Sequence, residues 1–146
     1  MPSGVVRRTT CLALLAGALV PGTASAARCD VIQLETLTVR FAGPPPSLRS
    51  GRPVSLAVDV VRGAGTPAEL AASDVEVFVG LTGDGWGAYD RRVTDAAGRV
   101  TASLAVPKGV RGPTELDVEG VRVVVDAPCA AVEEHGRVVT PWARVR

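Results

Sequence analysis

The clearest pattern in the chain is an alternation of apolar and polar residues that begins after Pro53. From Val54 to Val60 every second residue is valine or leucine, and serine, alanine and aspartate stand between them. A period of two is that of a β-strand with one buried face, because successive side chains point to opposite sides. Residues 74–81 repeat the pattern, with Glu76 and Phe78 on the outer face. No segment has a sustained helical period, so the sequence predicts an all-β protein.

Two further strands are expected on either side of the turn Asp95-Ala96-Ala97-Gly98. Aspartate is favoured at the first position of a type I turn and glycine at a left-handed last position. Residues 100–106 alternate again, and Pro107 ends the ladder because it has no N–H to donate. The stretch from Tyr89 to Pro107 is therefore predicted to be a β-hairpin, with a buried core strand second and a strand nearer an edge first.

Shorter patterns predict the remaining elements. Residues 31–41 alternate imperfectly and are expected to form one first strand, and residues 137–140 a closing strand. Thr66 to Glu69 has the pattern of a capping box and predicts about one turn of helix. The glycines of residues 82–87 predict an irregular loop. Gly120 marks either a bulge or a tight turn between two apolar runs.

The first 26 residues have the features of a secretory signal peptide. A pair of arginines precedes an apolar run from Cys11 to Val20, and Ala24-Ser25-Ala26 follows. This order predicts cleavage after Ala26, and the run is shorter than the roughly 20 residues of a membrane span. We expect a secreted, single-domain protein over residues 27–146, with ordinary or twin-arginine export both left open.

Two cysteines remain after cleavage, Cys29 and Cys129. An even pair in a chain bound for an oxidising compartment predicts one disulfide, between the first strand and a late one. Closing a loop of about 100 residues stabilises a fold by up to about 4 to 5 kcal/mol in the chain-entropy model. The two cysteines form no CxxC motif of the kind used by redox or metal-binding thiols.

Short strands broken by glycine and proline, together with one long-range disulfide, predict a two-sheet antiparallel sandwich of about seven strands. A small closed barrel is the alternative. Three stretches, Pro53 to Val60, Asp74 to Val79 and Val93 to Pro107, resemble the bacterial immunoglobulin-like domains of invasin-type surface proteins. The resemblance covers about residues 48–118. It implies an immunoglobulin-like fold and a role as an extracellular spacer or adhesion module.

Charge argues against two kinds of partner. Loss of the two signal-peptide arginines leaves 14 basic residues against 15 acidic ones, a net charge of −1. The basic residues are scattered along the sequence. We therefore expect no nucleic-acid partner and no stable membrane insertion after cleavage.

Catalytic and metal chemistry have few candidate residues. His135 is the only histidine, it stands in Glu133-Glu134-His135-Gly136, and no serine lies in a G-x-S-x-G elbow. With both cysteines bridged, zinc would find only this histidine and carboxylates as ligands. We expect no catalytic residue, no metal, no cofactor and no enzymatic activity.

Trp86 is the most informative single residue. A tryptophan among glycines either covers one end of the sandwich or presents its ring to a ligand. In the second case Tyr89 is its natural companion, and Asp84 and Asp90 supply polar contacts. The spacing of these two aspartates matches no calcium loop, and an Asp-Gly turn explains Asp84 without an ion.

The sequence predicts a non-enzymatic extracellular interaction or structural module. Its partner would be an unknown extracellular protein or envelope component, contacted by loops at one end of the sandwich. The alternative is a secreted small-ligand or metal-binding protein that uses the Gly83 to Tyr89 loop.

Overall fold

The computed structural model describes residues 30–127 and 130–146, and of Asp30, Asp126, Ala127 and Ala130 it describes the backbone alone. The described chain forms strands β1 (Asp30–Leu34), β2 (Leu37–Phe41), β3 (Pro53–Arg62), β4 (Leu70–Ala71), β5 (Glu76–Gly83), β6 (Trp86–Val93), β7 (Arg99–Ala105), β8 (Glu115–Ala127) and β9 (Ala130–Pro141). No helix in this part of the chain is long and apolar enough to cross a membrane. The predicted signal peptide, Cys29 and Cys129 lie outside the described residues.

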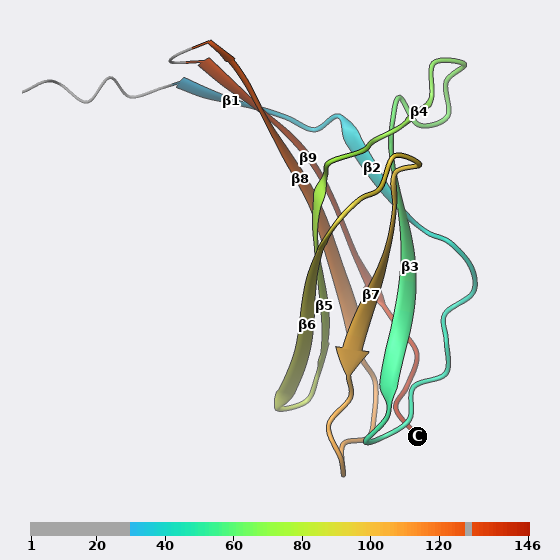
Figure 1. Ribbon diagram of the computed structural model, residues 1–146. Coiled ribbons are helices and arrows are strands. Elements are labelled where there is room, and N and C mark those ends of the chain that lie inside the picture. Colours follow the sequence, from blue (N-terminus) through green and yellow to red (C-terminus); the bar gives the residue numbers. More distant parts are fainter. Residues whose placement is uncertain (1–29, 128–129) are drawn as a thin grey trace, which may run out of the picture.

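The strands form two sheets that pack face to face (Figure 1). One sheet has five strands in the order β1-β9-β8-β5-β6. The other is centred on β3, with β2 paired to it, β7 paired to its first seven residues and β4 to its last two. All pairs are antiparallel except β1 with β9, which run parallel. The prediction of an all-β fold with two sheets is confirmed.

The core lies between the sheets and consists of alternate residues from facing strands. The inward residues predicted for 54–60, 75–81 and 100–106 are buried or half-buried, and Glu76 and Phe78 face outward as expected. The largest fully buried side chains among them are Val58, Val60, Val75, Val77, Val79, Leu81 and Leu104. Burial of each such aliphatic side chain contributes about 1.5 to 3 kcal/mol, which makes this core the main source of stability.

The predicted hairpin over residues 89–107 is wrong. Both of its strands exist, as β6 and β7, but β6 pairs with β5 and β7 pairs with β3 in the other sheet. The turn itself forms as expected, because the Gly98 N–H donates to the Asp95 carbonyl at 2.9 Å and Gly98 has a φ of 71°. β6 lies at a sheet edge as predicted, whereas β7 is also an edge strand. Alternation identifies strands but does not say which strands pair.

The five residues from Thr94 to Gly98 carry the chain from one sheet to the other. The Thr94 hydroxyl donates to the Ala72 carbonyl at 2.7 Å and accepts from the Val75 N–H at 3.0 Å. At the other end the Val60 N–H donates to the Gly98 carbonyl at 2.8 Å. A Cβ on Gly98 would lie 2.5 Å from the Val60 carbonyl oxygen, so only glycine fits. The crossing is thus fixed at both ends by hydrogen bonds to the backbone.

The hairpin of this region is formed by β5 and β6. Gly83 pairs with Trp86, which leaves Asp84-Gly85 as a two-residue turn in which Gly85 has a φ of 72°. The prediction of an irregular loop over residues 82–87 is therefore wrong. Asp-Gly between alternating runs is the strongest short-range hairpin signal, and here further glycines surround it.

The first predicted strand is also corrected. Residues 31–41 form β1 and β2, which lie in different sheets with Glu35 and Thr36 between them. Leu37 is buried and Val39 is half-buried, whereas Val31, which shares their parity, is exposed. The closing strand is longer than predicted, since β9 begins at Ala130.

Two further local predictions are wrong: the turn of helix at Thr66 to Glu69, and the bulge or tight turn at Gly120. The segment Thr66 to Glu69 forms turns and no helix, with the Thr66 N–H donating to the Gly63 carbonyl at 3.1 Å and the Glu69 N–H to Thr66 at 3.1 Å. Gly120 is neither a bulge nor a turn, because β8 passes through it in regular register opposite Gly136. Gly136 is packed against the backbone of Leu37, where a Cβ would clash. These glycines serve close packing.

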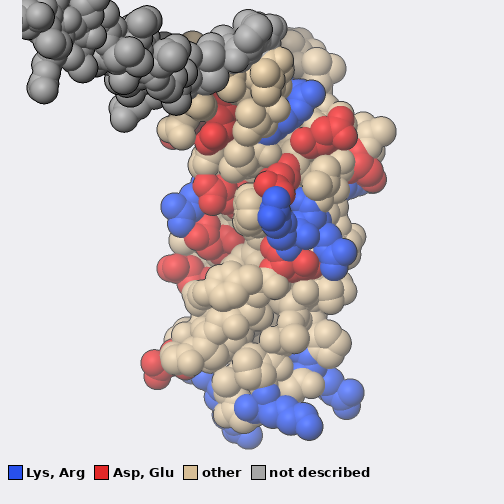
Figure 2. All heavy atoms as spheres, turned by 60° about the vertical axis from the view of Figure 1, so that its left-hand side comes forward, with Lys and Arg blue, Asp and Glu red and all other residues tan. Residues whose placement is uncertain are grey.

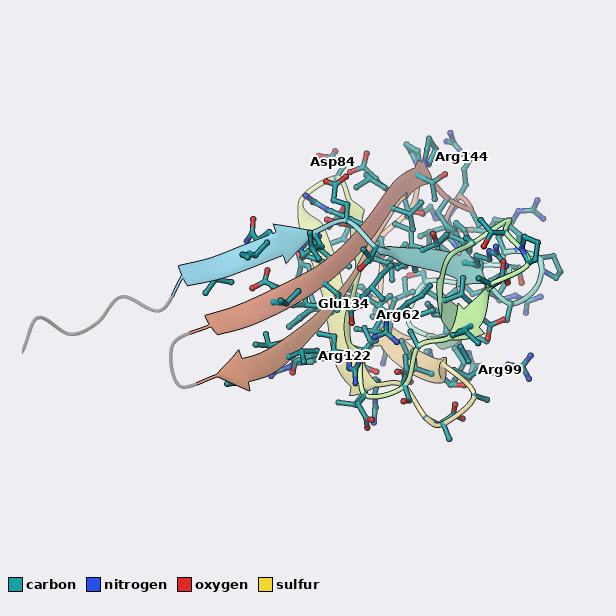
Figure 3. The ribbon with its side chains drawn as sticks, turned by 90° about the horizontal axis from the view of Figure 1, so that it is seen from above. Arg62, Asp84, Arg99, Arg122, Glu134 and Arg144 are labelled. Atoms are coloured by element: carbon teal, nitrogen blue, oxygen red, sulfur yellow. The ribbon has the colours of Figure 1, made fainter. Side chains whose placement is uncertain are left out.

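Glu134 joins the two sheets through a pair of arginines. Its carboxylate accepts two hydrogen bonds from Arg62 of β3, one of them from Nε at 2.6 Å, and Arg122 of β8 lies 3.4 Å away. Figure 3 shows the three side chains close together between the layers. The Glu134 side chain is only 14% exposed. Arg62 first, and Arg122 in addition, hold the pKa of Glu134 below its ordinary value of 4.5.

We expect Thr94→Val to destabilise the protein by about 2 to 6 kcal/mol. Valine keeps the shape but leaves the Ala72 carbonyl and the Val75 N–H without partners, at about 1 to 3 kcal/mol for each buried group. Thr94→Ser keeps the hydroxyl and should cost about 1 kcal/mol for the lost methyl group. Urea unfolding measures both variants. Equal stability of the valine and serine variants would show that the crossing does not depend on this hydroxyl.

The Glu134 ion pairs predict a dependence of stability on pH. Because the folded-state pKa is lowered, ionised Glu134 stabilises the fold above about pH 4.5, and this contribution is lost as pH falls through the folded-state value. The gap in unfolding free energy between wild type and Glu134→Gln should therefore be larger at about pH 7 than at about pH 3. Glu133→Gln, which removes no arginine partner, is the matched control. If the gap in unfolding free energy were the same at about pH 7 and about pH 3, the ion pairs of Glu134 could not be the cause of the gap.

Candidate functional site

The outer face of the five-stranded sheet carries a groove of about 410 Å³. It runs across β5, β6 and β8, on the side of the sheet that faces away from the core. Its lining consists of Phe78, Val79, Gly80, Thr82, Tyr89, Asp90, Arg91, Glu115, Asp117 and Glu119. It thus combines two aromatic rings, a glycine floor and several carboxylates.

Tyr89 forms the most exposed part of the groove. Its side chain points outward from β6, opposite Gly80 of β5, and is 74% exposed. A Cβ on Gly80 would lie 3.1 Å from the ring, and one on Gly87 would lie 2.6 Å from the hydroxyl oxygen. The ring therefore lies along the sheet surface over two residues that have no side chains. Two glycines and one tyrosine together form a flat aromatic platform.

Phe78 and Arg91 form the next row of the groove. The Arg91 guanidinium lies over the Phe78 ring, 5.3 Å from its centroid, and also pairs with Glu76. A guanidinium within about 6 Å of a ring face is attracted to its π-electrons. Phe78 is 37% exposed. The Arg91 guanidinium thus partly covers the face of the Phe78 ring, whereas no cation of the described residues lies over the Tyr89 ring.

Three carboxylates alternate along the opposite side of the groove, on the outer face of β8. Asp117 accepts two hydrogen bonds from Arg137, at 2.9 and 2.6 Å, and this arginine lowers the pKa of Asp117. Glu119 lies 2.6 Å from Nε2 of His135. The Glu115 carboxylate has no hydrogen bond or ion pair within the described residues. It is therefore the acidic group of the groove that is free to receive a cation.

The four residues predicted to contact a ligand do not converge on one point. Trp86 lies on the opposite face of β6 from Tyr89, packs against the core and covers Gly83. Asp84 is exposed in the β5–β6 turn. Tyr89 and Asp90 both border the groove. The contact role of these four residues remains a prediction, with Tyr89 the member best placed for it.

Asp90 is engaged in holding β6 against β7. Its carboxylate accepts from the Ser103 N–H at 2.8 Å, from Arg92 Nε at 2.9 Å and from the Arg91 N–H at 2.8 Å. The bond from Ser103 is the largest cause of its lowered pKa, with Arg92 and Arg91 acting in the same direction. Because Ser103 lies in the other sheet, Asp90 links the two layers at their open edge.

The sequence analysis predicted neither the three carboxylates on one side of the groove nor the position of Phe78 in its lining. The signal was present, because residues 115, 117 and 119 are acidic and alternate with the buried Leu116 and Val118. Such spacing places three carboxylates on one face of a strand. What the sequence did not indicate is that β8 lies next to β5 and thereby faces Tyr89 across Gly80.

Metal ligation finds little support in this part of the chain. His135 is bonded to Glu119, Glu134 to Arg62, and Glu133 accepts a hydrogen bond from Gln33 at 3.3 Å. Neighbouring residues of β9 point to opposite faces, so the three do not face one point. Within residues 30–127 and 130–146, no group of three or more histidine, cysteine, aspartate or glutamate side chains could hold a metal ion.

Comparison with known proteins adds no assignment. No protein-family model matches the sequence, and none of the curated proteins searched matches it. The function must therefore be argued from the groove and the surface of the described residues.

Proposed function

We propose that the protein is a non-enzymatic extracellular interaction module whose groove binds a cationic side chain of a partner protein. The observation that carries the proposal is the Tyr89 ring, 74% exposed and laid flat over Gly80, in the same groove as the unpaired Glu115 carboxylate. An exposed aromatic platform attracts a cation through its π-electrons, and a free carboxylate supplies a counter-charge. Lysine and arginine side chains offer both a charge and an apolar stem.

The chemistry of the groove supports binding more than turnover. Asp117 and Glu119 are held in pairs with Arg137 and His135, and the pKa of Asp117 is lowered. A general acid or base would need a pKa shifted toward the working pH. Tyrosine, by contrast, is enriched among the residues that dominate binding energy at protein interfaces. These features favour recognition of a partner.

The alternative of a small-ligand or metal site in residues 83–89 has less support. The segment is a tight hairpin, and Trp86 packs inward while Tyr89 points outward. The Asp90 oxygens already accept three hydrogen bonds. Asp84 and Tyr89 are the exposed members of the four predicted contact residues.

The proposal includes an immunoglobulin-like fold and an extracellular location. In an immunoglobulin sandwich, strands A, B and E face a sheet that holds C, F and G. The order β2-β3-β7 against β6-β5-β8-β9 agrees with that scheme if β3 corresponds to B and β5 to C. This agreement supports the resemblance to invasin-type domains. Such a module exported by a signal peptide over residues 1–26 would meet its partner outside the cell.

We also propose the disulfide between Cys29 and Cys129. Asp30 and Ala130, each of which directly follows one of the cysteines, are Cα partners in the parallel β1–β9 ladder. Neighbouring strands lie about 4.8 Å apart, within the range of Cα separations that a disulfide spans. The register of β1 with β9 therefore supports this pairing.

The secreted protein should contain one bridge and begin near Ala27. Mass spectrometry with thiol alkylation before and after reduction checks both points. Reduction should lower the free energy of unfolding by up to about 4 to 5 kcal/mol, since the closed loop is about 100 residues long. Two alkylated thiols without reduction would refute the bridge.

Short peptides test the groove directly. Labelled eight-residue peptides with a central lysine or arginine, and matched peptides with glutamine, are titrated with the protein and followed by fluorescence anisotropy. The cationic peptides should bind more tightly. Tyr89→Ala and Glu115→Gln should each weaken that binding by about 3- to 10-fold, through loss of a cation–π contact or of a charged hydrogen bond.

Leu70→Ala is the matched control, because Leu70 is an exposed apolar residue, 65% accessible, on β4 of the other sheet. It should leave peptide affinity unchanged. Unfolding curves of all variants show that each remains folded. The groove proposal fails if the glutamine peptides bind equally well, or if Tyr89→Ala has no more effect than Leu70→Ala.

A further inference from the structure

Six basic side chains gather at one end of the sandwich. They come from three segments that are far apart in the sequence: Arg49 and Arg52 before β3, Lys108 and Arg111 after β7, and Arg144 and Arg146 after β9. All six are exposed. Figure 1 places these segments at the same end, and Figure 2 shows the blue side chains collected there. We call these six residues the basic end.

The six residues are scattered along the sequence, as noted above, and are gathered only by the fold. Backbone hydrogen bonds hold the three segments together. The Arg146 N–H donates to the Leu48 carbonyl at 3.1 Å, the Val145 N–H to Gly112 at 2.9 Å, and the Gly51 N–H to Pro107 at 3.0 Å. Sequence patterns gave no sign of these contacts, because they join loops whose neighbours are set by the sheets.

The charges of the basic end are unneutralised. None of its six side chains forms an ion pair with a described residue, whereas each of the other seven described arginines does: Arg40, Arg62, Arg91, Arg92, Arg99, Arg122 and Arg137. Asp84 and Glu115 line a neighbouring hollow with Pro113 and Pro141 and form no ion pair with any of the six side chains. The molecule is thus close to neutral as a whole but carries a concentrated positive charge at one end.

The loops that carry these charges are held together by backbone hydrogen bonds and border a hollow. This hollow has a volume of about 380 Å³ and is lined by Ser47, Ala143, Arg144, Val145 and Arg146. Ser50 fixes the adjoining loop, since its Oγ accepts from the Gly109 N–H at 2.6 Å. The backbone of this end is thus preformed, and the six long side chains become ordered only when they bind a charged ligand.

Two observations narrow the kind of ligand. None of the exposed large apolar side chains of the described chain lies in residues 47–52, 107–113 or 143–146, so this end has nothing to insert into a bilayer. Trp142, the aromatic residue closest in sequence, is half-buried and packs against Phe41 with ring centroids 4.8 Å apart. Positive charge is therefore the main feature by which this end can recognise a ligand.

We propose that the basic end binds a linear extracellular polyanion, a polymer with repeated phosphate, sulfate or carboxylate groups. Such a polymer can place several anions against six cations that are spread over one end, which a single small anion cannot do. The site is separate from the groove and does not depend on the function proposed for it.

Inorganic polyphosphate is a suitable probe, titrated with the full secreted chain at several salt concentrations. Affinity should fall steeply with salt, with a slope of log K against log salt of about −4 if all six cations engage. The variant Lys108→Gln, Arg144→Gln, Arg146→Gln should bind about 10-fold more weakly or worse, because each removed cation weakens contact with a charged surface.

Arg40→Gln, Arg91→Gln, Arg99→Gln is the matched control, since it removes the same net charge from exposed residues elsewhere. Its affinity should change by less than about 2-fold, because these arginines are already paired. Equal losses in the two triple variants would overturn the proposal in favour of a net-charge effect.

Tighter binding to vesicles with anionic lipids than to polyphosphate would overturn the proposal in favour of a membrane. If monomeric phosphate at equal phosphorus concentration displaced polyphosphate, a polymeric ligand would not be required, and the proposal would be overturned.

Discussion

The transfer of the chain between the two sheets at Thr94 to Gly98 determines much of the fold. Only five residues separate a strand of one layer from a strand of the other, and both ends of the link are bonded to the backbone. Because β7 is thereby delivered to β3, β6 is left at the edge of the five-stranded sheet. Asp90 then connects the two edges through the Ser103 N–H, and Glu134 connects the layers through Arg62. The aliphatic core supplies stability, and these polar links set which strands face each other.

Alternation along the sequence was enough to predict β3, β5 and β7 and their inward residues. Val58, Val77 and Leu104 are buried where a period of two places them. Pairing was beyond that signal, because a strand with one apolar face is compatible with any neighbour that shares the layer. The Asp95 turn and the Asp84-Gly85 turn look similar in the sequence, yet one crosses between sheets and the other closes a hairpin. The difference is set by tertiary contacts such as the one between Gly98 and Val60.

The candidate site was predictable only in part, for the same reason. Tyr89 was predicted only as a companion of Trp86, and the structure places the two side chains on opposite faces of β6. The outward direction of Tyr89 follows from the parity of Ala88, which is buried. The carboxylates that face it belong to β8, about 30 residues later, and meet it only through the register of β5 with β8. The basic end depends even more on the fold, since it combines three loops that no local pattern relates.

The groove and the basic end give the module two surfaces of opposite chemical character. One face has an aromatic platform with a free carboxylate, and one end has six unpaired cations. Such an arrangement suits a protein that holds a partner on its sheet while attached to an anionic polymer. Amide chemical-shift mapping of the labelled protein tests this most directly, with a lysine peptide and polyphosphate added in separate titrations. The peptide should shift the amides of Gly80, Tyr89 and Asp117, and polyphosphate those of Arg49, Lys108 and Arg144. Shifts of the same amides by both ligands, or shifts confined to the outer face of β2 and β3, would contradict it.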